Sequence, residues 1–385
     1  MVLSFTLLEM ELKQLLTDLI AIDSTSTLSN EPVVAYIEQY FEGSDVLCRR
    51  LPAHEDGKFN LLLLKGDPCE EGLTLCGHMD TVPAKPENWI TCPWELNEKA
   101  GNWYARGSCD MKGFVAIALQ AIMNAQIIQG CLAVLLVCDE ELGSFGAKHV
   151  LENGLPVPIP KQVIIGEPTS LQVVRLHKGH LSMRISIDGV SAHTGSPHLG
   201  KNALVEGGKI ICALAELSSQ YESVCTETSE CFPSVAKFPV LTTSTMKSGS
   251  AINVVPDSCE IGVGLRLLPD QNKEDVVLEI KDVISSVCKL PWELEELGDN
   301  PTMHTSETSK VNQWLSAHIG QHKSVGVSYG TDGGYLSRGG FECVLYGAGD
   351  IAVAHKPDEY VPVNEMLTCV ETIDAAVKHF CGGDV

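Results

Sequence analysis

Seven acidic or histidine side chains follow short apolar runs of the sequence or open a helical pattern. They are His78, Asp80, Asp110, Glu140, Glu141, Glu167 and His355. Sites in open α/β sheets form at the carboxyl ends of strands. We therefore expect His78, Asp110, Glu141, Glu167 and His355 to meet in one crevice.

The residue types indicate a metal. Imidazole and carboxylate without thiolate suit catalytic zinc, cobalt or manganese better than structural zinc. Two histidines and three carboxylates exceed the needs of one catalytic zinc, but they suit two ions about 3.5–4 Å apart that share a bridging carboxylate. In an extended His78-Met79-Asp80 segment, Asp80 lies on the same side as His78 and can hold its other ring nitrogen. Taken singly, such residues are more often helix caps or solvated loop residues, so the metal hypothesis depends on their joint placement.

The elements that position these residues alternate between strand and helix. Buried strands are predicted at 61–66, 73–77, 132–138, 162–166 and 342–347, and helices at 111–125 and 144–153. This order is typical of an α/β domain with a central, mostly parallel sheet, here formed by 1–181 and 296–385.

The segment 182–295 has a different pattern, which predicts an inserted α+β domain. Its expected order is β-α-β-β-α-β, the ferredoxin-like arrangement. The predicted strands are 182–190, 234–246, 252–268 and 292–297, and the predicted helices are 201–219 and 272–288.

Composition narrows the function classes. The chain has 385 residues, with 50 Asp plus Glu against 27 Lys plus Arg, and a net charge of −23. This acidity argues against nucleic acid or an anionic membrane as partner. No apolar run approaches the roughly 20 residues of a membrane span, and the start is interpreted as an amphipathic helix (Leu7, Leu8, Leu12, Leu15 and Leu19) and not as a signal peptide. The 15 scattered cysteines, without a C-x-x-C pair, predict reduced thiols and a cytoplasmic protein.

Seven stretches of the chain together resemble a known family, the di-zinc amidohydrolases that include acetylornithine deacetylase and succinyl-diaminopimelate desuccinylase. They are GHMDTVP (77–83), RGSCDMKG (106–113), CDEELGSFGA (138–147), IIGEPTSLQVVRLHKGH (164–180), SAHTGSP (191–197), NVVPD (253–257) and AHKPDEYVPV (354–363). They span nearly the whole chain in the family's order. LHKGH and AHKPDEY are most similar to the acetylornithine deacetylase branch.

The resemblance implies two divalent ions, zinc or cobalt. His78 and Glu167 would hold one ion, Glu141 and His355 the other, and Asp110 would bridge them, while Asp80 orients His78. Glu140 would be the general base, and an extended backbone would point Glu140 and Glu141 in different directions. The family often has a cis peptide at the position of Asp110–Met111.

The resemblance also implies residues that contact the substrate. His193 would stabilise the oxyanion from the partner subunit, which makes the protein a homodimer and the inserted domain a lid. Five further residues would bind the substrate: Arg266, Asn253, Lys178, Gly330 and Thr331. For Arg266 and Lys178, a surface ion pair is the alternative.

The implied reaction is hydrolysis of an N-acyl amino acid. The substrate that the resemblance favours is N2-acetyl-L-ornithine, which would give L-ornithine and acetate in arginine biosynthesis. Acetylcitrulline deacetylase, succinyl-diaminopimelate desuccinylase and a metal-dependent exopeptidase are alternatives. Two departures from the family pattern bear on this: Cys109 precedes Asp110, and Asp332 follows Thr331 as in the desuccinylase-like branch. A metal-free binding protein on the same fold would lack part of the ligand set, which is complete here.

Overall fold

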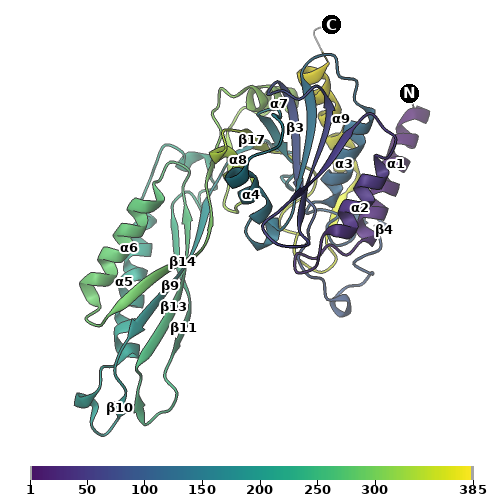
Figure 1. Ribbon diagram of the computed structural model, residues 1–385. Coiled ribbons are helices and arrows are strands. Elements are labelled where there is room, and N and C mark those ends of the chain that lie inside the picture. The colour runs from purple at the N-terminus through teal and green to yellow at the C-terminus, as the bar shows by residue number, and fades with distance from the viewer. Residues whose placement is uncertain (1, 383–385) are drawn as a thin grey trace. The chain divides into compact units, whose positions relative to one another are not determined.

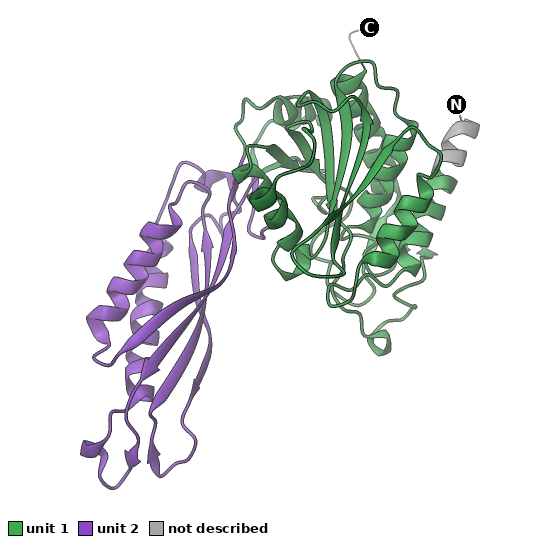
Figure 2. Ribbon diagram, in the orientation of Figure 1, with its two compact units in different colours: residues 1–175, 305–325, 331–385 green, residues 176–304, 326–330 purple. Residues whose placement is uncertain are grey.

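The computed structural model describes residues 2–382, with side chains described from Glu9 onward. The chain divides into two compact units (Figure 2). Unit 1 comprises Met1–Arg175, Thr305–Val325 and Thr331–Val385, and unit 2 comprises Leu176–His304 and Gly326–Gly330.

Unit 1 is built on a mixed sheet (Figure 1). The spatial order of its strands is β1 (Leu47–Pro52), β2 (Phe59–Gly66), β6 (Cys131–Val137), β3 (Gly72–His78), β7 (Gln162–Ile165) and β17 (Glu342–Leu345), with β8 (Val174–His177) next. The central strands β6, β3, β7 and β17 are parallel, and the pairs towards both edges are antiparallel. The α/β class and the five strands predicted for this sheet are confirmed.

Both faces of this sheet are covered. Successive β2 residues alternate, with Leu61 and Leu63 in the larger apolar cluster and Leu62 and Leu64 in a smaller one. The larger cluster includes residues of α1 (Val2–Ala21), α2 (Glu31–Tyr40), α3 (Lys112–Asn124), α7 (Lys310–Ile319) and α9 (Val363–Cys381). On α1, Leu12, Leu15 and Leu19 are buried as predicted; the side chains of Leu7 and Leu8 lie outside the described residues.

Unit 2 has the predicted ferredoxin-like order. Its elements are β9 (Gly179–Asp188), α5 (Ala203–Tyr221), β11 (Val240–Ser248), β13 (Ser258–Leu267), α6 (Lys273–Val287) and β14 (Trp292–Asn300). The sheet order is β11-β13-β9-β14, with every neighbouring pair antiparallel. Alternate β9 side chains are buried, as expected for a sheet with helices on one face. Asn202 and Asn272 cap the two helices with their side-chain oxygens.

The remaining elements are short. They are β4 (Asn97–Lys99), β5 (Asn102–Tyr104), α4 (Phe145–Asn153), β10 (Ala192–His193), β12 (Val254–Val255), β15 (Met303–His304), β16 (Val325–Val327), α8 (Gly333–Arg338), β18 (Tyr360–Pro362) and the 3-10 turns η1 (Pro86–Asn88), η2 (Glu140–Leu142), η3 (Pro197–Leu199) and η4 (Ser229–Cys231). Within residues 2–382, we find no helix with the length and apolar character needed to cross a membrane.

Candidate metal centre

The predicted ligands occupy one edge of the unit 1 sheet. His78 is the last residue of β3, Glu141 lies in η2 after β6, and Glu167 follows β7 by two residues. Because β3, β6 and β7 run parallel, these residues leave the sheet at the same edge. Asp110 precedes α3, and His355 lies between β17 and β18.

Four of the five predicted ligands are in direct contact. His78 Nε2 lies 3.1 Å from Asp110 Oδ1, and His355 Nε2 lies 3.2 Å from Asp110 Oδ2. His355 Nε2 is also 2.9 Å from Glu141 Oε2. Asp110 therefore stands between the two imidazoles, with one carboxylate oxygen towards each. Ligand atoms of His78, Asp110 and Glu141 all lie within 4.8 Å of one another.

Glu167, the fifth predicted ligand, is buried beside this group. Its Oε1 has no hydrogen-bond partner among the described residues. Burial raises the pKa of Glu167 well above its usual range, and the negative charge of Asp110 adds to this effect. A buried carboxylate oxygen without a donor requires either a proton or a cation.

The charge balance of the cluster favours cations. Burial raises the pKa of Glu140 and Glu141, most strongly that of Glu140. Hydrogen bonds with Asp110 and Glu141 raise the pKa of His355 to about 10. Burial alone would raise the pKa of Asp110, but His355 and His78 hold it well below its usual range. Carboxylates outnumber the two imidazoles, so this donor set of oxygen and imidazole nitrogen fits divalent metal ions.

Asp80 acts on the cluster differently from the prediction. Its main-chain oxygen, and not its carboxylate, makes the closer contact with His78, at 2.9 Å from Nδ1; the carboxylate lies 3.7 Å away. The carboxylate instead accepts hydrogen bonds from the backbone N–H groups of Glu140 and Glu141, both at 3.2 Å, and from Ser26 Oγ at 2.8 Å. It therefore fixes the segment that carries the predicted base and a predicted ligand.

The sequence predicts extended backbone at Glu140 and Glu141. Both residues lie instead in the 3-10 turn η2. Asp139 precedes them with a φ of 54°. Ser144 Oγ donates a hydrogen bond of 3.3 Å to Glu140 Oε1. The expected extended backbone is thus wrong: the turn exposes N–H groups at its start, and these groups are the donors to Asp80.

Two further acids support the cluster: Asp332 was evident from the sequence only as a departure from the family pattern, and Glu359 was missed. Asp332 is fully buried at the start of α8, and burial raises its pKa to about 7, with Asp80 and Glu141 among its charged neighbours. Glu359 Oε1 accepts the backbone N–H groups of Cys109 and Asp110, at 3.0 and 3.1 Å, and its other oxygen binds Arg106. Glu359 follows His355 by four residues in the AHKPDEY motif, a signal that could have drawn attention to it. The Asp110–Met111 peptide is cis, as the resemblance implied.

A second group with metal-ligand side chains consists of His54, Cys138 and Asp139. Lys58 Nζ lies 2.6 Å from Asp139 Oδ1, and His54 Nε2 lies 3.4 Å from Oδ2. The lysine already supplies the positive charge that a buried carboxylate needs, so we interpret this group as an ion pair.

His193 and Asn253 are neighbours in unit 2. The antiparallel pair β10–β12, which the sequence did not predict, places His193 opposite Val254, and Thr194 N donates to Asn253 O at 3.0 Å. Both residues are exposed. His193 Nδ1 accepts a hydrogen bond of 3.0 Å from Gly195 N, which leaves Nε2 as the ring nitrogen that can donate.

Among the residues that the structure describes, Lys178 and Arg266 have no partner for the surface ion pairs considered as the alternative. Lys178 is fully buried, and its Nζ donates to Phe238 O at 2.5 Å; burial, with Arg266 nearby, lowers its pKa to about 8. Arg266 lies opposite His180 in the β13–β9 pair, and partial burial lowers its pKa. Gly330 faces Asn300, whose side chain would lie 3.0 Å from a Cβ at that position. Thr331 is buried in unit 1 and accepts the N–H of Gly333 at 3.1 Å.

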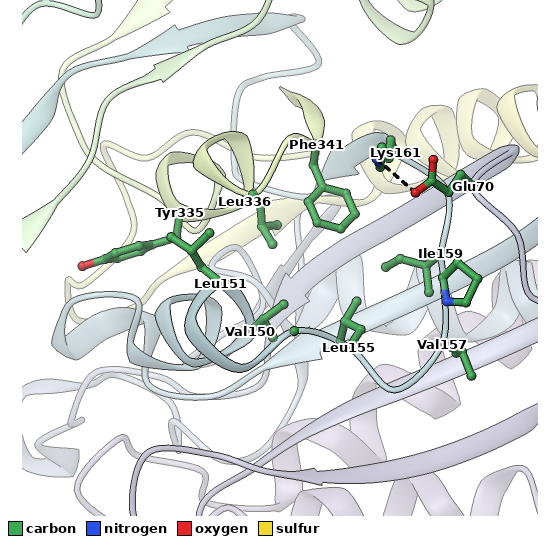
Figure 3. Close-up of a pocket in the computed structure, with 13 residues that line it drawn as sticks. Glu70, Val150, Leu151, Leu155, Val157, Ile159, Lys161, Tyr335, Leu336 and Phe341 are labelled. Atoms are coloured by element: carbon green, nitrogen blue, oxygen red, sulfur yellow. Dashed lines mark ion pairs between the residues drawn. The ribbon is translucent and has the colours of Figure 1, made fainter.

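An apolar pocket of about 260 Å³ lies elsewhere in unit 1 (Figure 3). Val150, Leu155, Ile159 and Phe341 contribute to its wall, and a Lys161–Glu70 ion pair of 3.0 Å lies at one end. No predicted metal ligand lines it, so it is separate from the buried acids.

The fold and the buried cluster define the class, a metal-dependent hydrolase. A model of Peptidase family M20/M25/M40 matches residues 74–379, and the chain belongs to this family. It is 33% identical over 381 residues to the acetylornithine deacetylase of Myxococcus xanthus, covering 97% of this chain and 98% of that protein. The acetylornithine deacetylase of Proteus mirabilis is 31% identical, with 94% and 93% covered. These relatives confirm the resemblance drawn from the motifs.

A solved structure supports the fold. The YXEP protein of Bacillus subtilis, described as a dinuclear metal binding peptidase of the M20 family, has a TM-score of 0.71 at 15% identity and covers 97% of this chain and 99% of that one.

Proposed function

We propose that the protein hydrolyses N2-acetyl-L-ornithine to L-ornithine and acetate, a step of arginine biosynthesis. The observation that carries the proposal is the pair of imidazoles joined through Asp110 amid buried carboxylates. The acetylornithine deacetylases that match nearly the whole chain support the choice of substrate.

We assign His78 and Glu167 to one ion and Glu141 and His355 to the other, with Asp110 shared. Zinc or cobalt fits this donor set. When bound, two such ions would polarise the amide carbonyl and make water more acidic. The unpartnered oxygen of Glu167 and the position of Asp110 between the two imidazoles support this assignment.

Glu140 is the proposed general base. Burial raises its pKa well above its usual range, which brings its proton affinity closer to that of a base working near neutral pH. In this role it accepts the proton of the attacking water and delivers it to the leaving amine. Asp80, which holds the backbone of Glu140, fixes the direction from which it does so.

Glu140→Gln tests this role. We expect it to keep bound metal and to lose roughly 10²–10⁴-fold in kcat. Glu152→Gln, on the exposed surface of α4, is the matched control. Full activity of Glu140→Gln would remove Glu140 from the mechanism.

A substrate panel tests the specificity. The purified protein, loaded with zinc or cobalt, is assayed for amine release from N-acetylornithine, N-acetylcitrulline, N-succinyl-diaminopimelate and N-acetylmethionine. Preference for the succinyl substrate would keep the hydrolytic mechanism and refute the proposed substrate. No turnover despite bound metal would refute all four substrates.

We further propose a cytoplasmic homodimer in which His193 donates through Nε2 to the oxyanion of the partner's substrate. Its exposure and the hydrogen bond that occupies Nδ1 support this role. Mixing Glu140→Gln with His193→Ala chains should restore about a quarter of wild-type activity, since half of the dimers are mixed and each has one intact site. No activity in verified mixed dimers would refute the contribution in trans.

A further inference from the structure

Two thiols in unit 1 lie close together at the opposite end of the sheet from the metal cluster. Cys69 lies in the connection between β2 and β3, and Cys131 is the first residue of β6. Their sulfur atoms are 3.5 Å apart. Cys69 is half-buried and Cys131 is buried. Both are reduced.

We propose that Cys69 and Cys131 form a reversible disulfide when a peroxide oxidises the protein. A disulfide sulfur–sulfur bond is about 2.05 Å long, so the two sulfurs must approach by about 1.5 Å. The preceding residues 66–68 are exposed, which leaves the Cys69 side room to move. Cys131 stays anchored in the sheet.

The backbone keeps the two residues in register for this reaction. Cys131 N donates to Glu71 O at 3.0 Å, and Gly72 lies opposite Cys131 in the β3–β6 pair. A Cβ at Gly72, whose φ is +116°, would lie 2.0 Å from Cys131 O. This close approach of the backbones holds the Cys69 connection over the start of β6.

The chemistry balances with one peroxide. Cys69, the more exposed sulfur, first loses its thiol proton, and the thiolate attacks a peroxide oxygen, breaks the O–O bond and becomes a sulfenic acid. The hydroxide that leaves takes up the proton released by the thiol and forms the first water. The sulfur of Cys131 then attacks the sulfenic sulfur, the S–S bond forms, and the sulfenic oxygen leaves as a second water. Two thiols lose two electrons and two protons, and hydrogen peroxide accepts both. Burial raises the pKa of Cys131 to about 12, consistent with its acting second.

The disulfide would join segments that also shape the apolar pocket. Cys131 belongs to the apolar cluster that contains Ile159, a pocket residue, and the half-buried Cys69 packs against this cluster. Glu70, next to Cys69, forms the ion pair with Lys161 in Figure 3. Cross-linking residues 62 apart in sequence should raise Tm by roughly 5 °C.

The test uses the reduced, metal-loaded full chain treated with one equivalent of hydrogen peroxide. Free thiols are then alkylated, and peptides are analysed by mass spectrometry. We expect a peptide pair joined through Cys69 and Cys131 that dithiothreitol separates. Cys69→Ser should abolish the linked pair, and Cys92→Ser, at an exposed cysteine, should leave it unchanged.

Three results would overturn the proposal: oxidation of Cys69 to sulfinic acid while Cys131 stays alkylated, a link from Cys69 to another cysteine such as Cys381, or no oxidation of Cys69 at all. Cys131→Ser should also abolish the linked pair, and if this variant does not fold, Cys69→Ser and the peptide map decide alone. The readout does not depend on turnover, so failure of the proposed substrate would not affect it.

Discussion

The ion pair between Arg106 and Glu359 makes a quantitative prediction. Arg106 Nη1 donates to Glu359 Oε2, and the side chains are 4% and 0% exposed. The other carboxylate oxygen holds the backbone of Cys109 and Asp110. Arg106→Met leaves that carboxylate buried without its cation. We therefore expect the free energy of unfolding to fall by about 3–5 kcal/mol.

Lys148→Met is the matched control in the same unit. Lys148 Nζ lies 3.9 Å from Glu152 Oε1, and the two side chains are 44% and 58% exposed. Solvent screens an exposed i,i+4 pair, so this substitution should cost less than about 1 kcal/mol. The measurement is the urea midpoint and slope of each variant against the wild type. Equal losses within about 1 kcal/mol would refute the argument that burial gives the Arg106–Glu359 pair its weight.

The same substitution has a pH signature. Burial raises the pKa of Glu359 to about 7, and Arg106 opposes that rise. Without Arg106 the folded-state pKa rises further. When the pKa of a carboxyl is higher in the folded state than in the unfolded state, the folded state binds more protons between the two values. The free energy of unfolding therefore falls as the pH rises towards the folded-state pKa. The deficit of Arg106→Met should therefore grow as the pH rises above about 7. A deficit that shrinks with pH would contradict the assigned direction.

Three further outcomes are expected. The folded-state pKa of Lys178, about 8, lies below its unfolded value of about 10.4. As the pH rises between these values, the free energy of unfolding of the wild type should therefore increase by up to about 3 kcal/mol relative to that of Lys178→Met. A difference between the two proteins that does not change with pH would contradict this. Asn202→Ala removes the acceptor for Val205 N and should cost about 1 kcal/mol in urea unfolding; a neutral result would exclude the cap. Chelation should lower Tm, and an unchanged Tm in calorimetry would argue against metal linked to folding.

The sequence predicts the central strands of the unit 1 sheet well because they are buried on both faces, but it did not predict β1, β8, β15 and β16 towards the edges. All seven residues of β6 are buried, so the apolar run and the strand coincide. The pair β10–β12 has two residues in each strand, too few for any alternation to show. Its consequence, the proximity of His193 and Asn253, therefore could not be predicted.

The candidate site also has some parts that the sequence predicts and others that it does not. The sequence could place the predicted ligands together because His78, Glu141 and Glu167 lie at or after the ends of β3, β6 and β7, and parallel strands end at the same edge of a sheet. The sequence did not predict the roles of Asp80 and Glu359, because both carboxylates accept hydrogen bonds from backbone N–H groups, and almost any residue type can supply such a donor. The sequence did not predict that Asp332 lies among the buried acids, because this residue opens a six-residue helix and does not follow a strand.

The electrostatics of unit 1 connect these observations. Elsewhere in this unit, buried charges have partners close by: Asp139 has Lys58 at 2.6 Å, and Glu359 has Arg106. Around His78 the carboxylates of Glu140, Glu167 and Asp332 are buried with raised pKa values. A sequence consistent with folding alone would replace such acids or pair them. Their gathering at the sheet edge is a local cost that a bound divalent cation offsets, which connects the stability of this edge to the metal that the chemistry needs.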